Sequence, residues 1–387
     1  MTEATLTQPL AGIKVVEFST MITASLASMM FAQQGADVIK VEPPGIGDPM
    51  RWLGSQKAGI SGLFHNCNRA KRSITLDLKT AEDVAHARQL CLSANVVIHN
   101  FRPGVMDRLG LGSEALRKEK PELIYCAITG FGHEGPLSGR PAYDHVMQAM
   151  AGLMTLQGSP DGFAYVKTLI CDKITAYTAA QAITAALFAR ERIGSGQHID
   201  LSMLESCVAF LWPDGGMHLT LKGEDVTHGA PFSDYYQLPL RSTDGAIAYA
   251  AMTDAHWDAV FDIVGRGDLK TEKKYKGLAN RSIHMAELAS IIASQKPDLT
   301  SAEMVAGLAK HDVPAAACLA LEDLPDHQQA LAIEIFEQAE HPLLGPIQNV
   351  SPPARFDGRK MVHGGPSPAL GEHSEAILAE LRADPQP

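Results

Sequence analysis

The sequence lacks the features that identify several large classes of protein. Its 387 residues include no apolar run long enough to cross a membrane, and neither end carries a recognisable targeting signal. The formal net charge is −11, which argues against a surface that binds nucleic acid. The six cysteines are scattered, without a CxxC pair or metal-ligand spacing, so free thiols are expected. We therefore expect a cytoplasmic protein that binds no metal, nucleic acid or membrane.

Several motifs of nucleotide-binding proteins and hydrolases are missing as well. The chain contains no GxGxxG after a strand, no GxxxxGK[ST], no GxSxG and no HExxH. None of its fifteen histidines forms an i, i+4 pair around an acid. Four histidines in informative segments are interpreted as hydrogen-bonded structural residues rather than catalysts: His65, His99, His133 and His145.

The pattern of the first 130 residues alternates between strand and helix. Strands are predicted at residues 13–18, 37–41, 73–78, 95–99 and 123–129, and helices at 24–33, 81–92 and 113–120. This alternation is typical of an α/β fold with a doubly wound, mostly parallel sheet. Ligands of such sheets bind at the carboxyl ends of the strands, which here are followed by the loops 19–23, 42–52, 99–108 and 130–144.

The later part of the chain has a different composition and predicts a second domain. Long helices are expected at 149–156 and 174–189 and a strand at 197–203. A Gly- and Pro-punctuated linker follows at 206–227, and a smaller α+β domain is expected at 228–325. That domain would contain strands at 235–240 and 246–251 and helices at 256–264, 282–293 and 301–310. A last helix is expected at 372–382.

Asp172 lies where a predicted strand, residues 165–171, meets the long Ala-rich helix. Aspartate is a favoured N-cap residue, so its carboxylate could simply accept backbone N–H groups of that helix. Alternatively, a carboxylate at the positive end of a helix could stay ionised at neutral pH and act as a nucleophile. The local pattern leaves both interpretations open. Asp144, before the helix expected at 146–156, is likewise interpreted as a cap of its own helix.

Two basic loops suggest a phosphorylated, nucleotide-bearing ligand. Arg69, Lys71 and Arg72 precede one predicted strand and Lys79 follows it, although these charges could also be solvated. The segment Asn100-Phe101-Arg102-Pro103-Gly104, closed by Arg108, follows another strand. Guanidinium groups match phosphate in charge and geometry, and an aromatic ring could stack on a purine.

Taken together, these segments resemble the family III CoA-transferases, which include an α-methylacyl-CoA racemase branch. The resemblance rests on seven segments in order: PLAGIKVVEFS, GADVIKVEPP, NRAKRSITLDLK, NFRPGVMDRLGL, ITGFGHEGPLSGRPAYD, ARERIGSGQHIDLSMLE and LGEHSEAIL. It implies a large CoA-binding domain formed by residues 1–205 and 326–387. It also implies a homodimer of two interlocked rings.

The resemblance also implies the chemistry and the residues of the site. Asp172 would attack an acyl-CoA, giving an aspartyl anhydride and then an aspartyl-CoA thioester, before CoA passes to a carboxylic acid. Acyl-CoA would be a substrate, and no permanently bound cofactor is implied. The expected supporting residues of the active site are Tyr143, Asp144, Met21, Ile22 and Trp52. The expected CoA-binding residues are Asn100, Phe101, Arg102, Arg108, Leu76, Lys79 and Arg72.

Two alternatives to a transferase are considered. A 2-methylacyl-CoA racemase needs two groups on opposite faces of the α-carbon, and members of that branch carry a histidine where this chain has Tyr143. A phenol is a poor proton carrier at neutral pH because its pKa is about 10. A glutamate of the racemases aligns near Thr253. A protein that binds acyl-CoA without turnover would have an altered residue at Asp172.

Overall fold

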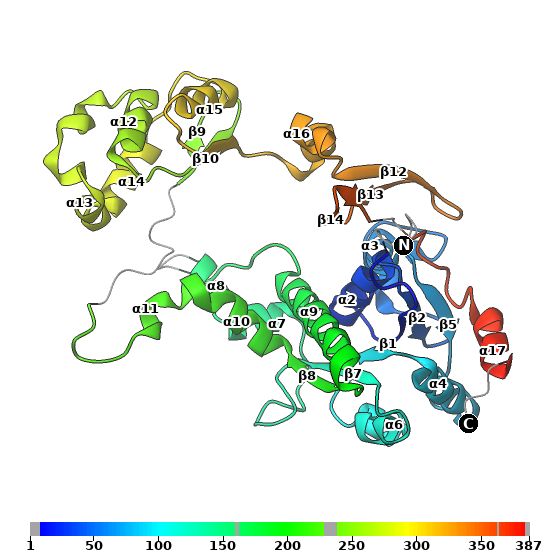
Figure 1. Ribbon diagram of the computed structural model, residues 1–387. Helices are drawn as coiled ribbons and strands as arrows, with labels where there is room; N and C mark the ends of the chain where they lie inside the picture. The colour runs from blue at the N-terminus through cyan, green and yellow to red at the C-terminus, as the bar shows by residue number, and fades with distance from the viewer. Residues whose placement is uncertain (1–7, 159–161, 228–237, 362–363, 384–387) are drawn as a thin grey trace. The chain divides into compact units, whose positions relative to one another are not determined.

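The computed structural model describes residues 8–158, 162–227, 238–361 and 364–383. The chain forms two compact units (Figure 1). The first combines the residues up to Leu211 with those from Ile333 onward, and the second spans Trp212–Ala332. Helices α10 (Met203–Gly215) and α11 (Met217–Thr220) occupy much of the segment that we expected to be a linker.

The first unit is built on a six-stranded parallel sheet in the order β5-β2-β1-β6-β7-β8. In β1, Val16 pairs with Ile39 on one side and with Val97 on the other. The strand order changes direction between β1 and β6, so the loops after these strands diverge and open a crevice at the carboxyl edge. The six strands are β1 (Lys14–Phe18), β2 (Asp37–Glu42), β5 (Arg72–Thr75), β6 (Val96–His99), β7 (Ile124–Thr129) and β8 (His198–Ser202).

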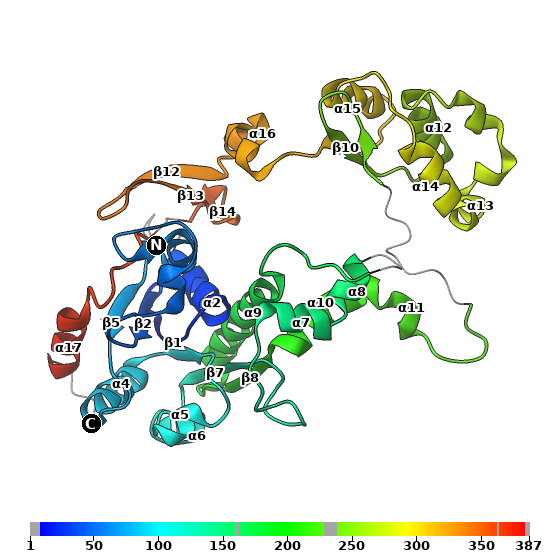
Figure 2. The same ribbon diagram turned by 180° about the vertical axis from the view of Figure 1, so that it is seen from behind.

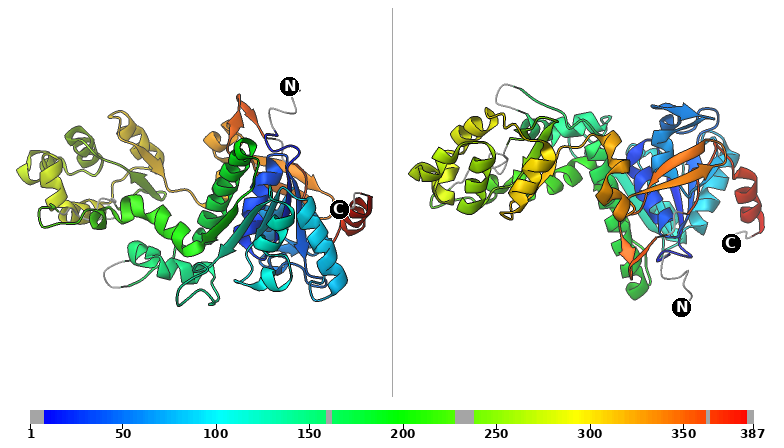
Figure 3. Two further views of the ribbon diagram at one scale, coloured as in Figure 1. Left: turned by 60° about the horizontal axis from the view of Figure 1, so that its bottom comes forward. Right: turned by 90° about the horizontal axis from the view of Figure 1, so that it is seen from above.

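Helices cover both faces of this sheet (Figures 1 and 2). On one face, α2 (Ile22–Gln33) and α9 (Ile170–Ile193) bury alanines and a few larger side chains against β1, β6 and β7. On the other face lie α4 (Ala81–Ser93), α6 (Ser113–Glu119) and α17 (Ser374–Ala383). Helix α17 packs against α4 and β5, so the last helix of the chain completes the core of a sheet formed by its first part (Figure 3).

The second unit contains a small antiparallel sheet, β9 (Leu240–Arg241), β10 (Ala246–Tyr249) and β11 (Ala315–Ala317). Its core gathers around Trp257 of α12 (Asp254–Ile263), with α14 (Met285–Ala293) and α15 (Ser301–Ala309). The helix expected at 282–293 is two helices, since α13 (Leu278–Ile283) ends just before α14. Of the strand expected at 235–240, residues 235–237 lie outside the described residues.

Shorter elements complete the first unit. They are the 3₁₀ turn η1 (Pro49–Trp52), β3 (Gln56–Lys57), β4 (Ile60–Ser61), α3 (Gly62–Asn68), α5 (Val105–Arg108), α7 (Asp144–Met150), α8 (Leu153–Gln157), β12 (Phe336–His341), β13 (Gly345–Val350), β14 (Arg355–Phe356) and β15 (Arg359–Lys360). Within the described residues, no helix is long and apolar enough to cross a membrane.

Two predictions next to the site are wrong. The helix expected at 149–156 is interrupted, because Gly152 adopts φ 86° between α7 and α8. The strand expected at 165–171 is an irregular segment followed by the first turn of α9. There the Val166 N–H donates to the side chain of Gln148 (3.0 Å) rather than to a neighbouring strand. A tertiary contact therefore overrides the β propensity of this apolar run.

Candidate active site

A cavity of about 360 Å³ lies at the carboxyl edge of the parallel sheet. It is formed by the loops after β1, β6 and β7 and by the first turn of α9, which is where the strand order reverses. Its lining residues are Thr20, Met21, Thr23, Asn100, Phe101, Arg102, Pro103, Val105, Ile128, Thr129, Gly130, Ser138, Arg140, Pro141, Ala142, Tyr143, Asp172 and Met203. The cavity thus brings together six of the residues expected from the sequence: Met21, Asn100, Phe101, Arg102, Tyr143 and Asp172.

Asp172 occupies the third position of α9 and is 8% exposed. The N-cap of that helix is Leu169, whose side chain makes no cap hydrogen bond. The cap is supplied from elsewhere in the chain: Asp144 Oδ2 accepts the N–H groups of Cys171 (2.7 Å) and Asp172 (3.1 Å). The interpretation of Asp172 as an N-cap is therefore wrong, and its carboxylate lines the cavity instead.

Asp144 was expected to cap its own helix and instead lies in the first turn of α7. It is 2% exposed, and its Oδ1 accepts a hydrogen bond from Gln148 Nε2 (2.7 Å). Gln148 also donates to the carbonyls of Val166 and Thr168 (both 3.2 Å). Through these contacts, α7 holds the segment that leads into Asp172. The preceding residue, Tyr143, is 64% exposed and lines the cavity.

The electrostatic surroundings of Asp172 favour its neutral form. Burial raises its pKa, and the negative charge of Asp144 raises it further, while Lys173 lowers it. The resulting pKa is about 7, compared with an ordinary value of 3.8. Burial and the charge of Asp144 thus outweigh the helix amino terminus, which does not keep this carboxyl group fully ionised at neutral pH. Asp144 accepts the N–H groups of Cys171 and Asp172. A carboxyl group poised near neutrality loses its proton readily and remains more nucleophilic than an ordinary carboxylate.

Asn100 connects the loops that follow β1 and β6. Its Nδ2 donates to the Thr20 carbonyl (2.7 Å) and to Thr23 Oγ1 (3.0 Å), and its Oδ1 accepts the Thr20 N–H (3.1 Å). Both amide hydrogens of Asn100 are therefore used within the protein. The side chain fixes the shape of the cavity wall, a role that its position after a strand did not reveal.

The loop after β6 presents aromatic and basic groups to the cavity. Phe101 is half-buried, and Arg102 is exposed at the rim. Arg108 ends α5 outside the lining of the cavity but folds back onto this loop, since a Cβ on Gly104 would lie 3.2 Å from its Nη1. Gly104 has φ 75°, a conformation that favours glycine. Arg140, from the loop after β7, is a second exposed guanidinium in the cavity wall.

Besides Arg108, three expected CoA-binding residues lie outside this cavity. Arg72 begins β5, at the opposite edge of the sheet, and pairs with Asp37 (2.6 Å) and with Glu380 (2.7 Å), so its assignment to CoA binding is not supported. Leu76 is 2% exposed and its side chain packs in the core. Lys79 is exposed after β5 but does not line the cavity.

Two further expected residues, Ile22 and Trp52, do not line the cavity either. The side chain of Ile22 is buried in a cluster with Met50 and Phe64. Trp52 is 51% exposed, and its indole N–H donates to the Ile46 carbonyl (2.8 Å).

The interpretation as hydrogen-bonded structural residues fits His65, His99 and His133, whereas His145 is exposed and makes a ring contact. His65 is buried between Ser367 (2.9 Å) and Asn349 (2.8 Å), and burial lowers the pKa of His99 to about 3. His133 pairs with Asp200 (2.9 Å), and His145 packs edge-on against Tyr165. In the described part of the chain, no group of three or more histidine, cysteine or acidic side chains could hold a metal ion.

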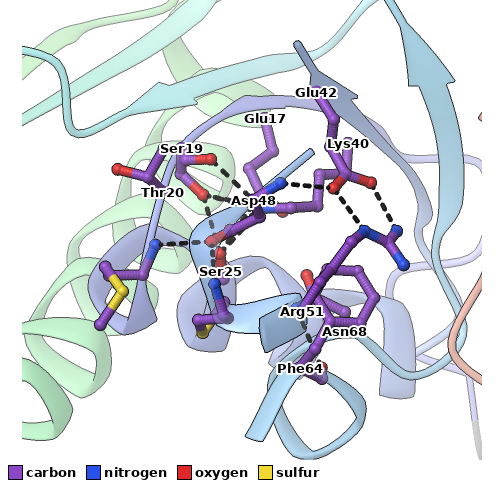
Figure 4. A network of polar contacts seen from close by, with 12 residues as sticks. Glu17, Ser19, Thr20, Ser25, Lys40, Glu42, Asp48, Arg51, Phe64 and Asn68 are labelled. Carbon is purple, nitrogen blue, oxygen red and sulfur yellow. Dashed lines mark hydrogen bonds and ion pairs between the residues drawn. The ribbon is translucent and has the colours of Figure 1, made fainter. Parts of the chain in front are cut away.

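Sequence reasoning missed a buried ionic network that contacts Met21 of the cavity wall (Figure 4). Three carboxylates and three cations are essentially inaccessible to solvent: Glu17, Glu42, Asp48, Lys40, Arg51 and Lys71. The pairs are Glu17 with both lysines (2.7 Å each), Asp48 with Lys40 (2.9 Å) and Glu42 with Arg51 (2.7 Å). A signal was present, because a charged residue in a strand buried on both faces needs a partner, and β1 and β2 each contain one within an apolar run.

Comparisons with known proteins identify the family of this chain. The sequence profile of CoA-transferase family III matches residues 10–374. The chain is 34% identical to a succinate–glutarate CoA-transferase of Agrobacterium fabrum, covering 96% of both chains. It is 31% identical to the mouse succinyl-CoA:glutarate CoA-transferase, covering 97% of this chain and 86% of the relative. A crystal structure of a CAIB/BAIF family protein from Brucella suis superposes with a TM-score of 0.84 at 32% identity, over 97% of this chain and 100% of that one. The protein belongs to CoA-transferase family III and is a CoA-transferase that moves CoA between acyl groups.

Proposed function

We propose that Asp172 is the nucleophile of this transferase and carries first the acyl group and then CoA. The observation that supports this proposal best is a buried carboxyl group, with a pKa of about 7, in the wall of a cavity at the strand-order reversal. Covalent catalysis suits CoA exchange because an anhydride or a thioester preserves the energy of the original thioester. Burial of Asp172 also limits the access of water, which would hydrolyse both intermediates.

The steps use only the two substrates and Asp172. A carboxylate oxygen of Asp172 attacks the thioester carbonyl, a C–O bond forms, the C–S bond breaks, and CoA leaves as its thiolate. The thiolate attacks the aspartyl carbonyl of the mixed anhydride, which releases the donor acid as a carboxylate and leaves an aspartyl-CoA thioester. The acceptor carboxylate then displaces the CoA thiolate from that thioester, and the thiolate attacks the acceptor carbonyl. Acyl-CoA departs and Asp172 is regenerated.

We further propose that the exchanged acids are short dicarboxylic acids. The two relatives described above are named for succinate, succinyl-CoA and glutarate. Two exposed guanidinium groups, Arg102 and Arg140, line the same cavity as Asp172. One cation would serve the phosphates of CoA from the loop after β6, and the other would pair with the distal carboxylate of the acid.

Trapping the intermediates tests the role of Asp172. The protein is incubated with succinyl-CoA or glutaryl-CoA and quenched with hydroxylamine, and its peptides are analysed by mass spectrometry. We expect a hydroxamate on Asp172 and none in Asp172→Asn. The variant Asp200→Asn, which changes an exposed aspartate of β8, serves as the control and should label like the native protein. Exchange that persists in Asp172→Asn would refute the proposal.

The same assay discriminates the alternatives. A racemase would label no residue with hydroxylamine and would exchange the α-proton of a 2-methylacyl-CoA in deuterated water. A non-catalytic binder would retain acyl-CoA without either reaction.

We also propose, on the basis of the family resemblance, that two chains form a homodimer of interlocked rings. The native mass should be twice that of the chain. A monomeric mass at micromolar concentration would contradict this assembly.

A further inference from the structure

Met21 has a backbone conformation that few residues other than glycine adopt. It is the N-cap of α2, with φ 64° and ψ −158°, and its side chain makes no cap hydrogen bond. Non-glycine residues persist in this region only where their surroundings hold them there, and such strain tends to gather at functional sites. Met21 and Thr23 both line the cavity that contains Asp172.

The side chain of Asp48 holds the backbone of Met21 in place. Asp48 Oδ1 accepts the Met21 N–H (3.2 Å) and the Met50 N–H (2.9 Å), and its Oδ2 pairs with Lys40 Nζ (2.9 Å). Figure 4 shows the Asp48 carboxylate among the polar groups of the buried network, close to Lys40 and Ser19. Asp48 itself is completely buried.

The charges of the network are paired, and three of its members lie on adjacent strands: Glu17 on β1, and Lys40 and Glu42 on β2. Lys40 Nζ also donates to Glu17 Oε1 (2.7 Å) and to Ser25 Oγ (3.0 Å). Burial lowers the pKa of Lys40, but the carboxylates of Asp48, Glu17 and Glu42 more than reverse this effect, so Lys40 stays charged. Lys40 of β2, itself bonded to Glu17 of β1, thus fixes the position of the Asp48 carboxylate. The hydrogen bond from the Met21 N–H to Asp48 in turn fixes the backbone of Met21.

A packed path leads from this turn to Asp172. Ile22, the residue after Met21, is buried with Met50, and Leu169 packs against the same cluster. Leu169 is the N-cap residue of α9, three positions before Asp172. A change in the backbone conformation of Met21 therefore alters the cavity wall directly, because Met21 is part of it. It also affects the first turn of α9 through the packing of Ile22 and Leu169.

We propose that Asp48 is a positioning residue for CoA transfer, which holds Met21 in its strained conformation and thereby fixes the cavity wall opposite the acyl group carried by Asp172. The inference rests on the proposed function, since it concerns acyl transfer to Asp172. Displacement of a reacting group by about 1 Å can slow a reaction on the order of 100-fold, so a small relaxation of this turn has a measurable effect.

The test compares variants of Asp48 with a matched variant of the same network. Asp48→Ala removes the acceptor of the Met21 N–H, whereas Asp48→Asn loses the charge but keeps an acceptor oxygen. Ser73→Ala is the control: it removes a hydrogen bond to Glu42 (2.8 Å) at a distance from Met21. We measure kcat, the KM for succinyl-CoA, the rate of hydroxamate formation on Asp172 and the melting temperature.

We expect Asp48→Ala to lower kcat and the labelling rate about 10- to 100-fold while the KM changes less than about threefold. Asp48→Asn should recover most of the lost rate, and Ser73→Ala should keep kcat within about twofold whatever its melting temperature. If Asp48→Ala does not fold, Asp48→Ser replaces it, because serine still caps the 49–52 turn but is too short to bond both Lys40 and Met21.

A double-mutant cycle with Met21→Gly separates positioning from general stability. Glycine adopts the conformation of residue 21 without strain, so the loss caused by Asp48→Ala should be smaller in the Met21→Gly background than in the native one. An equal loss in both backgrounds, or the same kcat loss in Ser73→Ala, would overturn the proposal. A native protein that forms no hydroxamate refutes the nucleophile instead. Normal labelling of the native protein and of Asp48→Ala refutes only the positioning role.

Discussion

Replacement of Asp172 by asparagine should make the protein more stable at neutral pH. In the fold the carboxyl group has a pKa of about 7, and its ordinary value is 3.8. A group that holds its proton more tightly in the folded state stabilises the fold below its unfolded pKa, and this contribution is lost as the pH rises toward the folded pKa. The native protein therefore loses stability between about pH 4 and pH 7 on account of Asp172.

The size of this effect follows from the difference between the two pKa values. The gap is about 3 pH units, and each unit corresponds to about 1.4 kcal/mol, so ionisation of Asp172 destabilises the fold by up to about 4 kcal/mol at pH 7–8. Asparagine has the same shape and stays neutral. The free energy of unfolding of Asp172→Asn should exceed that of the native protein by an amount that grows from near zero at pH 4 to about 4 kcal/mol at pH 8.

Urea titrations at pH 5, 6, 7 and 8 measure this difference, with Asp200→Asn as the control for loss of an exposed charge. A stability difference that stays constant across these pH values would refute the argument, because it would show that Asp172 titrates as an ordinary carboxyl group. In the mechanism proposed above, the same ionisation activates Asp172 as the nucleophile. The rate of acylation should therefore rise with pH and level off above about pH 7.

Two further substitutions test the assignments made at the loops. Arg72→Gln should leave the KM for acyl-CoA within about twofold and lower the free energy of unfolding by no more than about 1 kcal/mol. The reason is that the guanidinium of Arg72 pairs with Asp37 and Glu380 at the far edge of the sheet. A large rise in KM would show that Arg72 contributes to CoA binding. Asn100→Ala should raise that KM about tenfold and destabilise the protein by about 1–3 kcal/mol, because it removes three hydrogen bonds to Thr20 and Thr23. Steady-state kinetics and urea titrations measure both, and an unchanged KM in Asn100→Ala would show that the shape of this loop does not affect CoA binding.

Periodicity was sufficient for the parallel strands of the first unit. Residues 13–18 and 95–99 alternate with helices and are mostly apolar, as is typical of strands buried on both faces, and β1 and β6 lie where this pattern predicted them. The carboxyl ends of these strands then indicated the loops of the cavity, including Asn100 and Phe101. The order of the resembling segments pointed to the family, which the comparisons confirm.

Local pattern failed where contacts distant in sequence decide the conformation. Nothing near residue 172 shows that Asp144, 28 positions earlier, supplies the cap of α9 and raises the pKa of Asp172. Likewise, Arg72 and Lys71 resemble phosphate ligands as a sequence, but Arg72 pairs with Asp37 and Glu380 and Lys71 with Glu17.

The sequence by itself determined the type of most elements of the parallel sheet and the edge of that sheet where the cavity lies, because these depend on residue type and short-range periodicity. The local pattern left the role of Asp172 open, and the family resemblance singled it out. Only the tertiary structure decided which charges are buried together, which loop atoms cap α9 and why Met21 can keep a conformation suited to glycine. Burial and distance govern those properties, and both arise only when strands and loops far apart along the chain are packed against one another.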